Sequence, residues 1–240
     1  MNLCEVDRLK IANNIYQISG HPYGFNSNMY AVDTQEGIII IDAGFSEHQY
    51  EESNLVLKKW GLDPQKVIAL FVTHAHFDHI GNAHIYEERG IPVYVGEADA
   101  DAAENGGESV LEDLFGRKFH VCRNVIRVKG KEVFSFGNVT VEVWNSPGHT
   151  KGNVSYLVYD KETRILFVGD MLIIGGTTPT DELIPELGWK GSPDFNKSDN
   201  MNSFNKMRNL KVDIVAPGHG SVYFGDSSSL FEIMYQKAEE

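Results

Sequence analysis

The chain of 240 residues fits one domain, residues 1–240, which is large enough to bury a core without disulfide bonds. Its 34 acidic and 21 basic side chains give a formal net charge of −13, which repels phosphate backbones and disfavours nucleic-acid partners and a nuclease role. No apolar run approaches the ~18 residues of a membrane span, so no membrane partner is expected.

The first half of the chain predicts strands that alternate with helices. β-Branched and apolar residues predict strands over 5–19 and 27–33, and the run 38–41 predicts a fully buried strand. Ser46 is expected to cap a helix that reaches Trp60. The next expected elements are a strand over 67–72, a helix over 80–89, a strand over 91–95, and two short helices within the acidic stretch 97–113, whose charges we interpret as a solvated face.

The second half predicts another run of strands. Alternating or apolar stretches predict strands at 133–136, 139–143, 165–170 and within 212–219. Residues 171–196 show no clear secondary structure, and we expect this long segment to shape a substrate site. Within it, Trp189 is interpreted as a packing anchor, with a substrate contact as the alternative. The order of elements suggests two sheets packed face to face with helices outside.

The cysteines and the N-terminus bear on the compartment. Cys4 and Cys122 are too few for a disulfide framework and have no C-x-x-C spacing, so both are expected to be free thiols in a reducing compartment. The first residues have no apolar core of signal-peptide length. These features predict a cytoplasmic protein.

The stretch Thr-His-Ala-His-Phe-Asp-His at 73–79 is predicted to bind metal. Alternate side chains of an extended segment point the same way, so His74 and His76 can reach one ion. Asp78 and His79 follow where the chain turns, and can serve a second ion; Asp78 would stand at a helix N-terminus. Imidazoles with a carboxylate suit zinc, iron, manganese or cobalt better than calcium or magnesium.

Three further candidate ligands follow predicted strands. They are His149 in Ser-Pro-Gly-His-Thr, Asp170 in Val-Gly-Asp and His219 in Pro-Gly-His-Gly. Loops at strand ends commonly carry functional groups, because the sheet fixes their position. The remaining histidines, His21, His48, His84 and His120, are interpreted as structural or exposed, although His21 is also a candidate to line a substrate pocket.

This motif set resembles the metallo-β-lactamase superfamily over most of the chain. The resemblance implies an α/β (α+β) fold, a four-layer αβ/βα sandwich of two mixed β-sheets packed face to face with helices outside, and a metal site in the cleft between the sheets. It further implies that His74, His76 and His149 bind the first metal, that Asp78, His79 and His219 bind the second, and that Asp170 bridges both.

This sequence differs from several known subgroups of the superfamily. The differences disfavour those subgroups but do not assign the chain to another one. True β-lactamases of this fold usually carry a secretory signal, and many have a cysteine where Asp170 stands, so antibiotic hydrolysis is not expected. The glyoxalase II enzymes are similar, but only 21 residues follow His219 here, too few for their helical extension. Lactonases have a tyrosine with no counterpart between 171 and 218, and flavodiiron oxidases have a glutamate in place of His76.

The function expected from these residues is that of a dinuclear metal-dependent hydrolase acting on a small ester, thioester or lactone. The expected cofactors are two divalent transition-metal ions, foremost zinc, with iron or manganese as alternatives. Two such ions about 3.5–4 Å apart can share a hydroxide that attacks a carbonyl carbon. Asp78 has a second expected role as a catalytic residue that orients the hydroxide or passes a proton to the leaving group. The expected partner is a small-molecule substrate, and no oligomeric state is indicated.

Three alternatives stand beside this hypothesis. A persulfide dioxygenase resembles the motif set but holds one iron with a subset of ligands, His74, His149 and Asp170 here, which suits non-haem iron. A nuclease of the same superfamily ranks third because of the charge. A closed structural zinc site uses four ligands, fewer than the seven candidates.

Overall fold

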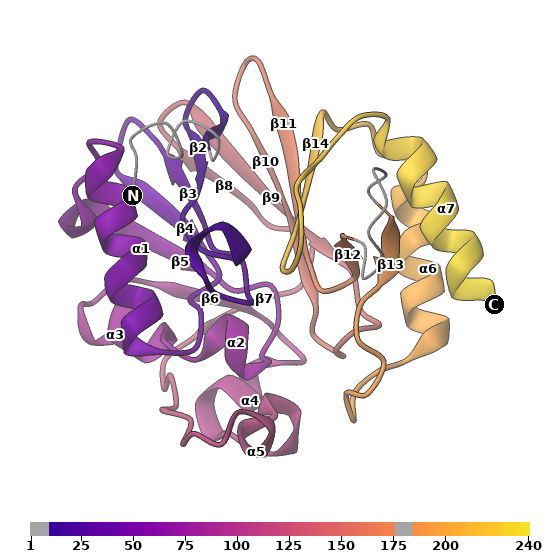
Figure 1. The fold of residues 1–240 in the computed structure, drawn as a ribbon, viewed down its shortest axis with the longest axis horizontal. Coiled ribbons are helices and arrows are strands. Elements are labelled where there is room, and N and C mark those ends of the chain that lie inside the picture. The colour runs from indigo at the N-terminus through magenta and orange to yellow at the C-terminus, as the bar shows by residue number, and fades with distance from the viewer. Residues whose placement is uncertain (1–9, 176–183) are drawn as a thin grey trace.

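Two mixed β-sheets with helices on their outer faces make up the computed structural model, which describes residues 10–175 and 184–240 (Figure 1). The first sheet has the order β1-β2-β3-β4-β5-β6-β7. Its pairs are antiparallel from β1 to β4 and parallel from β4 to β7. Its strands are β1 (Lys10–Ala12), β2 (Ile15–Gln17), β3 (Tyr30–Asp33), β4 (Ile38–Ile41), β5 (Val67–Phe71), β6 (Val93–Gly96) and β7 (Ile126–Val128).

The second sheet has the order β15-β14-β11-β10-β9-β8, with β11 and β14 parallel and the other pairs antiparallel. A separate two-stranded sheet joins β12 to β13. The strands are β8 (Val133–Phe136), β9 (Val139–Asn145), β10 (Val154–Tyr159), β11 (Arg164–Gly169), β12 (Leu172–Ile174), β13 (Pro185–Leu187), β14 (Ile214–Pro217) and β15 (Tyr223–Phe224).

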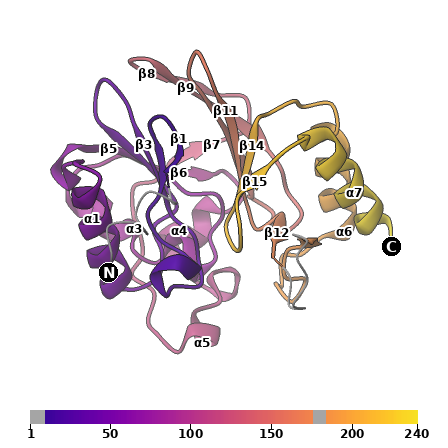
Figure 2. The same ribbon diagram turned by 45° about the horizontal axis from the view of Figure 1, so that its top comes forward.

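The helices cover the two outer faces. Figure 1 and Figure 2 place α1 and α3 outside the first sheet and α6 and α7 outside the second. The α-helices are α1 (Glu47–Lys59), α2 (Phe77–Ile80), α3 (Ala83–Glu88), α4 (Ala100–Asn105), α5 (Glu112–Phe115), α6 (Lys197–Met207) and α7 (Ser227–Glu239). Short 3-10 helices occupy His21–Tyr23, Pro64–Lys66 and Glu108–Val110. No helix in the described ranges combines the length and apolar character needed to cross a membrane.

Strand β4 shows how the sequence builds this layering. All four of its isoleucines are buried, and because successive side chains point to opposite faces, Ile38 and Ile40 pack toward α1, while Ile39 and Ile41 pack toward the other sheet. The inter-sheet core also includes Phe71 and Tyr156, whose ring centroids are 5.1 Å apart. A third core lies between the second sheet and helices α6 and α7. These cores confirm the predicted four-layer αβ/βα sandwich.

Several predicted element boundaries were wrong. The strand expected over 5–19 is two strands, β1 and β2, within its described part, and residues 5–9 lie outside the described residues. The segment 171–196, expected to lack secondary structure, carries β12 and β13, although residues 176–183 also lie outside the described residues. Strand β10 and helices α6 and α7 had no predicted counterpart.

The helix expected over 80–89 is interrupted by tertiary contacts. It is replaced by α2 and α3, with Gly81 and Asn82 between them. A Cβ at Gly81 would lie 2.7 Å from Cα of Phe45 and 2.6 Å from the Phe77 carbonyl oxygen, so only glycine permits this approach. The Asn82 side chain donates hydrogen bonds to the carbonyls of Ala43 and Ser46. The loop after β4 therefore docks where the helix would otherwise continue.

Candidate metal centre

The seven candidate ligands lie in loops or short helices that follow four strands. His74, His76, Asp78 and His79 follow β5, His149 follows β9, Asp170 follows β11, and His219 follows β14. Since β11 and β14 are parallel neighbours, their carboxyl ends meet at one edge, where the Gly218 amide donates to the Gly169 carbonyl at 2.8 Å. A side chain at Gly218 would collide with Asp170 Oδ1, so glycine there permits the approach of the two loops.

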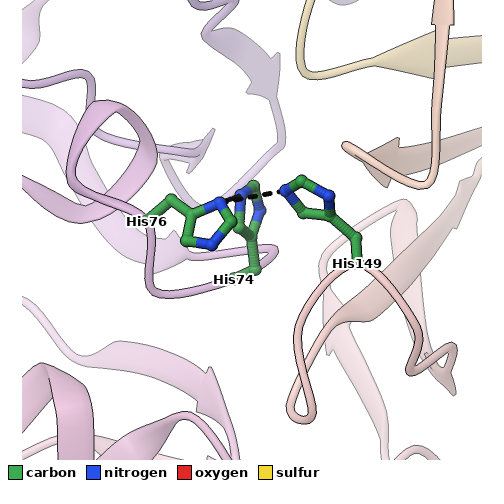
Figure 3. A group of neighbouring side chains, drawn as sticks. All are labelled: His74, His76 and His149. Carbon is green, nitrogen blue, oxygen red and sulfur yellow. Dashed lines mark hydrogen bonds between the residues drawn. The ribbon is translucent and has the colours of Figure 1, made fainter. Parts of the chain in front are cut away.

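Three buried imidazoles converge in the first group. His74 Nε2 lies 3.1 Å from His76 Nδ1, and His149 Nε2 lies 2.9 Å from the same His76 atom. Figure 3 shows the rings of His74 and His76 on one side and the ring of His149 on the other, with the three rings directed toward one another. A tetrahedral zinc ion with ligands at about 2.0–2.1 Å separates them by roughly 3.3–3.4 Å, so this group has nearly the ligand spacing of such an ion.

Asp78, His79 and His219 form the second group. His219 Nε2 lies 3.1 Å from Asp78 Oδ2 and 3.2 Å from His79 Nε2, and His79 Nε2 lies 3.5 Å from Asp78 Oδ2. The Asn26 carbonyl lies 3.0 Å from His219 Nδ1, which turns Nε2 of that ring toward the carboxylates. These ligand atoms all lie within 4.8 Å of one another.

Asp170 lies between the two groups. Its Oδ2 is 3.6 Å from His149 Nε2 in the first group and 3.1 Å from His219 Nε2 in the second, and its Oδ1 is 3.4 Å from His79 Nε2. The buried Oδ1 atom accepts no hydrogen bond from the described residues. A buried carboxylate oxygen left in this state is costly, and a cation would satisfy it.

The protonation states differ between the two groups. Burial lowers the pKa of His74, His76 and His149, that of His76 to about 3, so these rings are neutral near pH 7. Neutral imidazole is the form that binds a metal.

The second group carries charge instead. Burial alone would lower the pKa of His79 and of His219, but Asp78 and Asp170 outweigh it, and the pKa of His219 rises to about 10. Burial alone would also raise the pKa of Asp78 and Asp170, but His79 and His219 lower both below the usual carboxyl range. The positive charges of two protonated imidazoles therefore balance the negative charges of two carboxylates. A divalent cation would supply the same positive charge, and its binding would release the two protons. The donor set thus fits transition-metal ions in both groups.

Asp42 supports the second group, and the sequence analysis did not single it out. It follows β4, is 1% exposed, and has φ = 59°, a left-handed conformation uncommon outside glycine. Its carboxylate accepts hydrogen bonds from the Thr73 amide at 2.7 Å and the Thr73 hydroxyl at 2.9 Å, and lies 2.9 Å from His79 Nδ1. With a metal bound, this contact would keep the one remaining proton of His79 on Nδ1, so that Nε2 faces the group as a ligand atom. The position of Asp42 at the end of a buried strand is the feature of the sequence that could have indicated its role.

Asp99 supports the first group and corrects the prediction that the charges of 97–113 are a solvated face. It is 3% exposed. Its carboxylate accepts hydrogen bonds from the Ala75 amide at 2.9 Å, the Thr150 hydroxyl at 2.7 Å and the Gly152 amide at 2.7 Å. It therefore joins the loop that carries His74 and His76 to the loop that carries His149. No spacing in the sequence indicates this contact.

Ser192 is a third supporting residue that the sequence analysis missed. Its hydroxyl lies 3.0 Å from His76 Nε2, the ring nitrogen that points away from the other two histidines. The same hydroxyl accepts a hydrogen bond from the Asp194 amide, and the Asp194 carboxylate pairs with Lys151 at 2.6 Å. The segment after β13 is thus held beside the first group.

A cleft of about 660 Å³ opens beside the centre, and Asp170 and His219 are part of its lining. His21 also lines it, as expected of a candidate pocket residue. Trp189 lines it too and is 47% exposed, so it is not the buried packing anchor that was expected, and the substrate contact stays a prediction.

The other histidines lie outside the centre. His48 is exposed and packs on Phe25, with centroids 5.5 Å apart, and the rings of His84 and His120 lie 4.8 Å apart. None of these three belongs to a potential metal-binding group within residues 10–175 and 184–240.

Comparison with known families identifies the chain. The sequence model of the metallo-beta-lactamase superfamily matches residues 22–219. The chain belongs to this superfamily. A relative, the probable metallo-hydrolase YqgX of Bacillus subtilis strain 168, is 32% identical over 162 residues, which cover 65% of this chain and 70% of that protein. The superfamily's members are metal-dependent hydrolases, and the His/Asp clusters of this chain fit its metal site.

Two further comparisons cover more of the chain. The acyl-coenzyme A thioesterase MBLAC2 of Gallus gallus is 27% identical over 222 residues, 83% of this chain and 74% of that protein. The crystal structure of a metallo-beta-lactamase family protein from Thermus thermophilus superposes with a TM-score of 0.73 at 19% identity, covering 95% of this chain and 80% of that one. This structural likeness supports the αβ/βα fold.

Proposed function

We propose that the chain is a dinuclear metal-dependent hydrolase of small esters, thioesters or lactones. The observation that carries this proposal is the position of Asp170, whose carboxylate contacts His149 of one ligand group and both His79 and His219 of the other. A carboxylate placed between two convergent groups suits two ions better than one. Seven ligands also exceed the four of a closed structural site.

The proposed roles of the ligands follow from their positions. His74, His76 and His149 would hold one ion, Asp78, His79 and His219 the other, and Asp170 both. When bound, two divalent transition-metal ions supply Lewis acidity and acidify water. Zinc is the foremost choice, with iron or manganese as alternatives.

Asp78 is the proposed proton carrier among the chain's own residues. Its Oδ2 lies 3.1 Å from His219 Nε2, and the side chain is largely buried between the two imidazoles of its group. A carboxylate at this point can accept a proton from water and pass it to a departing alcohol or thiol. The helix α2 that carries Asp78 has only four residues, so the positive charges of the neighbouring imidazoles, rather than a helix dipole, keep the carboxylate ionised.

The substrate proposal draws on the cleft and on one relative. A volume of about 660 Å³ lies within the range of small-molecule sites. The similarity to an acyl-coenzyme A thioesterase over 83% of the chain supports including thioesters among the substrates. The net charge of −13 still disfavours a nuclease role.

The alternative of a mononuclear iron dioxygenase is less well supported. Its ligand subset, His74, His149 and Asp170, is present, but it leaves Asp78, His79 and His219 without a role although their ligand atoms converge. Iron as the sole metal, with oxygen uptake on glutathione persulfide, would favour that alternative.

Hydrolysis assays test the proposed function. Protein purified with its metals should turn over aryl esters, acyl thioesters or lactones, and His76→Ala and Asp170→Ala should each lower kcat/KM by at least about a thousandfold. His120→Gln changes an exposed histidine outside the centre and is the matched control. No turnover of the whole panel, or full activity in either centre variant, would contradict the proposal.

A further inference from the structure

We propose that the substrate carries an apolar chain, which lies along the cleft from the metal centre toward Trp189 and Phe224. This inference rests on the proposed hydrolase function and names the substrate class more narrowly. It concerns the arm of the cleft that extends away from the ligands. None of the seven candidate ligands except Asp170 and His219 lines that cleft.

Apolar side chains are the largest group in the lining of this arm, beside the uncharged or weakly basic side chains of Gln17, His21, Asn26 and Ser221. Beyond Asp170 and His219, the lining comes from β1, from the end of β2 and the loop that follows it, from the segment around β12 and β13, and from β15 with the turn before it. Its apolar members are Ile11, Pro22, Ile173, Ile174, Trp189, Val222 and Phe224. A substrate whose reactive carbonyl lies at the centre would therefore place one of its substituents against this apolar surface.

The apolar wall is held at a fixed position relative to the centre. Gly220 follows the ligand His219, has φ = +79°, and forms a parallel bridge with Ile174. The next amide, of Ser221, donates to the Ile174 carbonyl. Phe224 then pairs with Ile214 across β14 and β15. The five residues 220–224 thus connect the ligand His219 to Phe224. Each of them either bonds to a strand or is the neighbour of a residue that does.

Two aromatic side chains at this cleft are unusually exposed. Phe224 is 63% exposed and Trp189 is 47% exposed, and both are among the few large hydrophobic residues exposed in the described part of the chain. Exposed aromatic area is unfavourable in water, and an apolar ligand that covers it gains free energy. Their meeting at one cleft with a candidate active site indicates a binding role.

The charged groups of the cleft do not favour a strongly charged substituent. Lys10 and Glu186 both belong to the lining and carry opposite signs. With Asp170 at the other end, no single sign of charge dominates the lining. The selective feature of the arm is therefore its apolar surface.

A chain-length series tests this inference. Protein purified with its metals is assayed on two series of aryl or alkyl esters and thioesters, one with acyl chains from two to eight carbons and one with an acetyl group and alcohols or thiols of increasing length. We expect kcat/KM to rise by about threefold to fourfold for each of the first methylenes in one of the two series. The ratio of long-chain to short-chain kcat/KM should fall about tenfold in Phe224→Ala and remain unchanged in Leu114→Ala, which alters an equally exposed side chain elsewhere (64% exposed).

The outcomes separate this inference from the proposed function. Turnover without a rise in either series would leave the hydrolase proposal standing and overturn the apolar arm. If no substrate is turned over, calorimetric binding of acetate and octanoate decides the inference. Octanoate binding at least about tenfold more tightly than acetate, with the preference lost in Phe224→Ala, would support it; equal binding would overturn it.

Discussion

The carboxylate of Asp99 accepts a hydrogen bond of 2.7 Å from the hydroxyl of Thr150, the residue directly after His149. The same carboxylate accepts a hydrogen bond from the amide of Ala75, the residue between His74 and His76. Asp99 therefore sets the distance between two loops whose imidazoles must meet at one point.

Replacement of Asp99 by alanine should loosen the first group. Two backbone amides and a hydroxyl lose a buried acceptor, which should lower the free energy of unfolding by about 1–3 kcal/mol. Metal affinity should fall about 10–100-fold, as for other residues that orient ligands without touching the metal. Titration of chelator-treated protein with zinc against a competing dye measures this change.

The neighbouring Asp101 supplies the control for this experiment. Its side chain is 80% exposed and pairs with Arg127, and such surface pairs contribute about 0–1 kcal/mol. Asp101→Ala should therefore bind zinc as the unaltered chain does. Asp99→Ala with the same affinity as Asp101→Ala would show that the contact has no positioning role.

Asp42→Asn should weaken the second group selectively. Asparagine tolerates the left-handed backbone at φ = 59°, so the change mainly removes the charge and one of the two acceptor oxygens that hold Thr73 and orient His79. We expect one of the two zinc-binding steps to lose about 10–100-fold in affinity while the other changes little. Equal loss in both steps would instead indicate a general loss of structure, which circular dichroism would reveal.

Cys122 should be unreactive in the folded chain. The pKa of the Cys122 thiol is raised to about 12, mainly by burial and further by the nearby carboxylate of Glu87. At pH 8 only about one thiol in ten thousand is then thiolate, the reactive form. In a Cys4→Ser variant, native protein should resist a thiol reagent that labels the urea-unfolded chain within minutes. Rapid labelling of the native variant would contradict this account of Cys122.

The ligands could be predicted from the sequence because each belongs to a short local pattern. His74 to His79 follow a buried strand within six positions, and His149, Asp170 and His219 each follow a strand with a glycine beside them. The buried run 38–41 likewise identified a central strand. Side-chain period and strand ends are local properties, so one sequence is enough to show them.

Asp99 and Ser192 could not be assigned in the same way, whereas Asp42 does follow a buried strand and could have been. Asp99 stands in a stretch of exposed acidic residues and differs from them only through contacts with residues 24, 51 and 53 positions away. Ser192 meets His76 across 116 positions. The break between α2 and α3 also depends on a distant loop, which docks at Gly81 and Asn82. Such features arise from packing, which local propensity does not describe.

The number of metal ions bound per chain tests the central claim most directly. Elemental analysis of protein purified without added metal, followed by zinc titration of the chelator-treated chain, gives this number for the unaltered protein and for Asp170→Ala. The account predicts two transition-metal ions per unaltered chain and at most one tightly bound ion in the variant. A single ion in the unaltered chain, or two equally tight ions in Asp170→Ala, would contradict it.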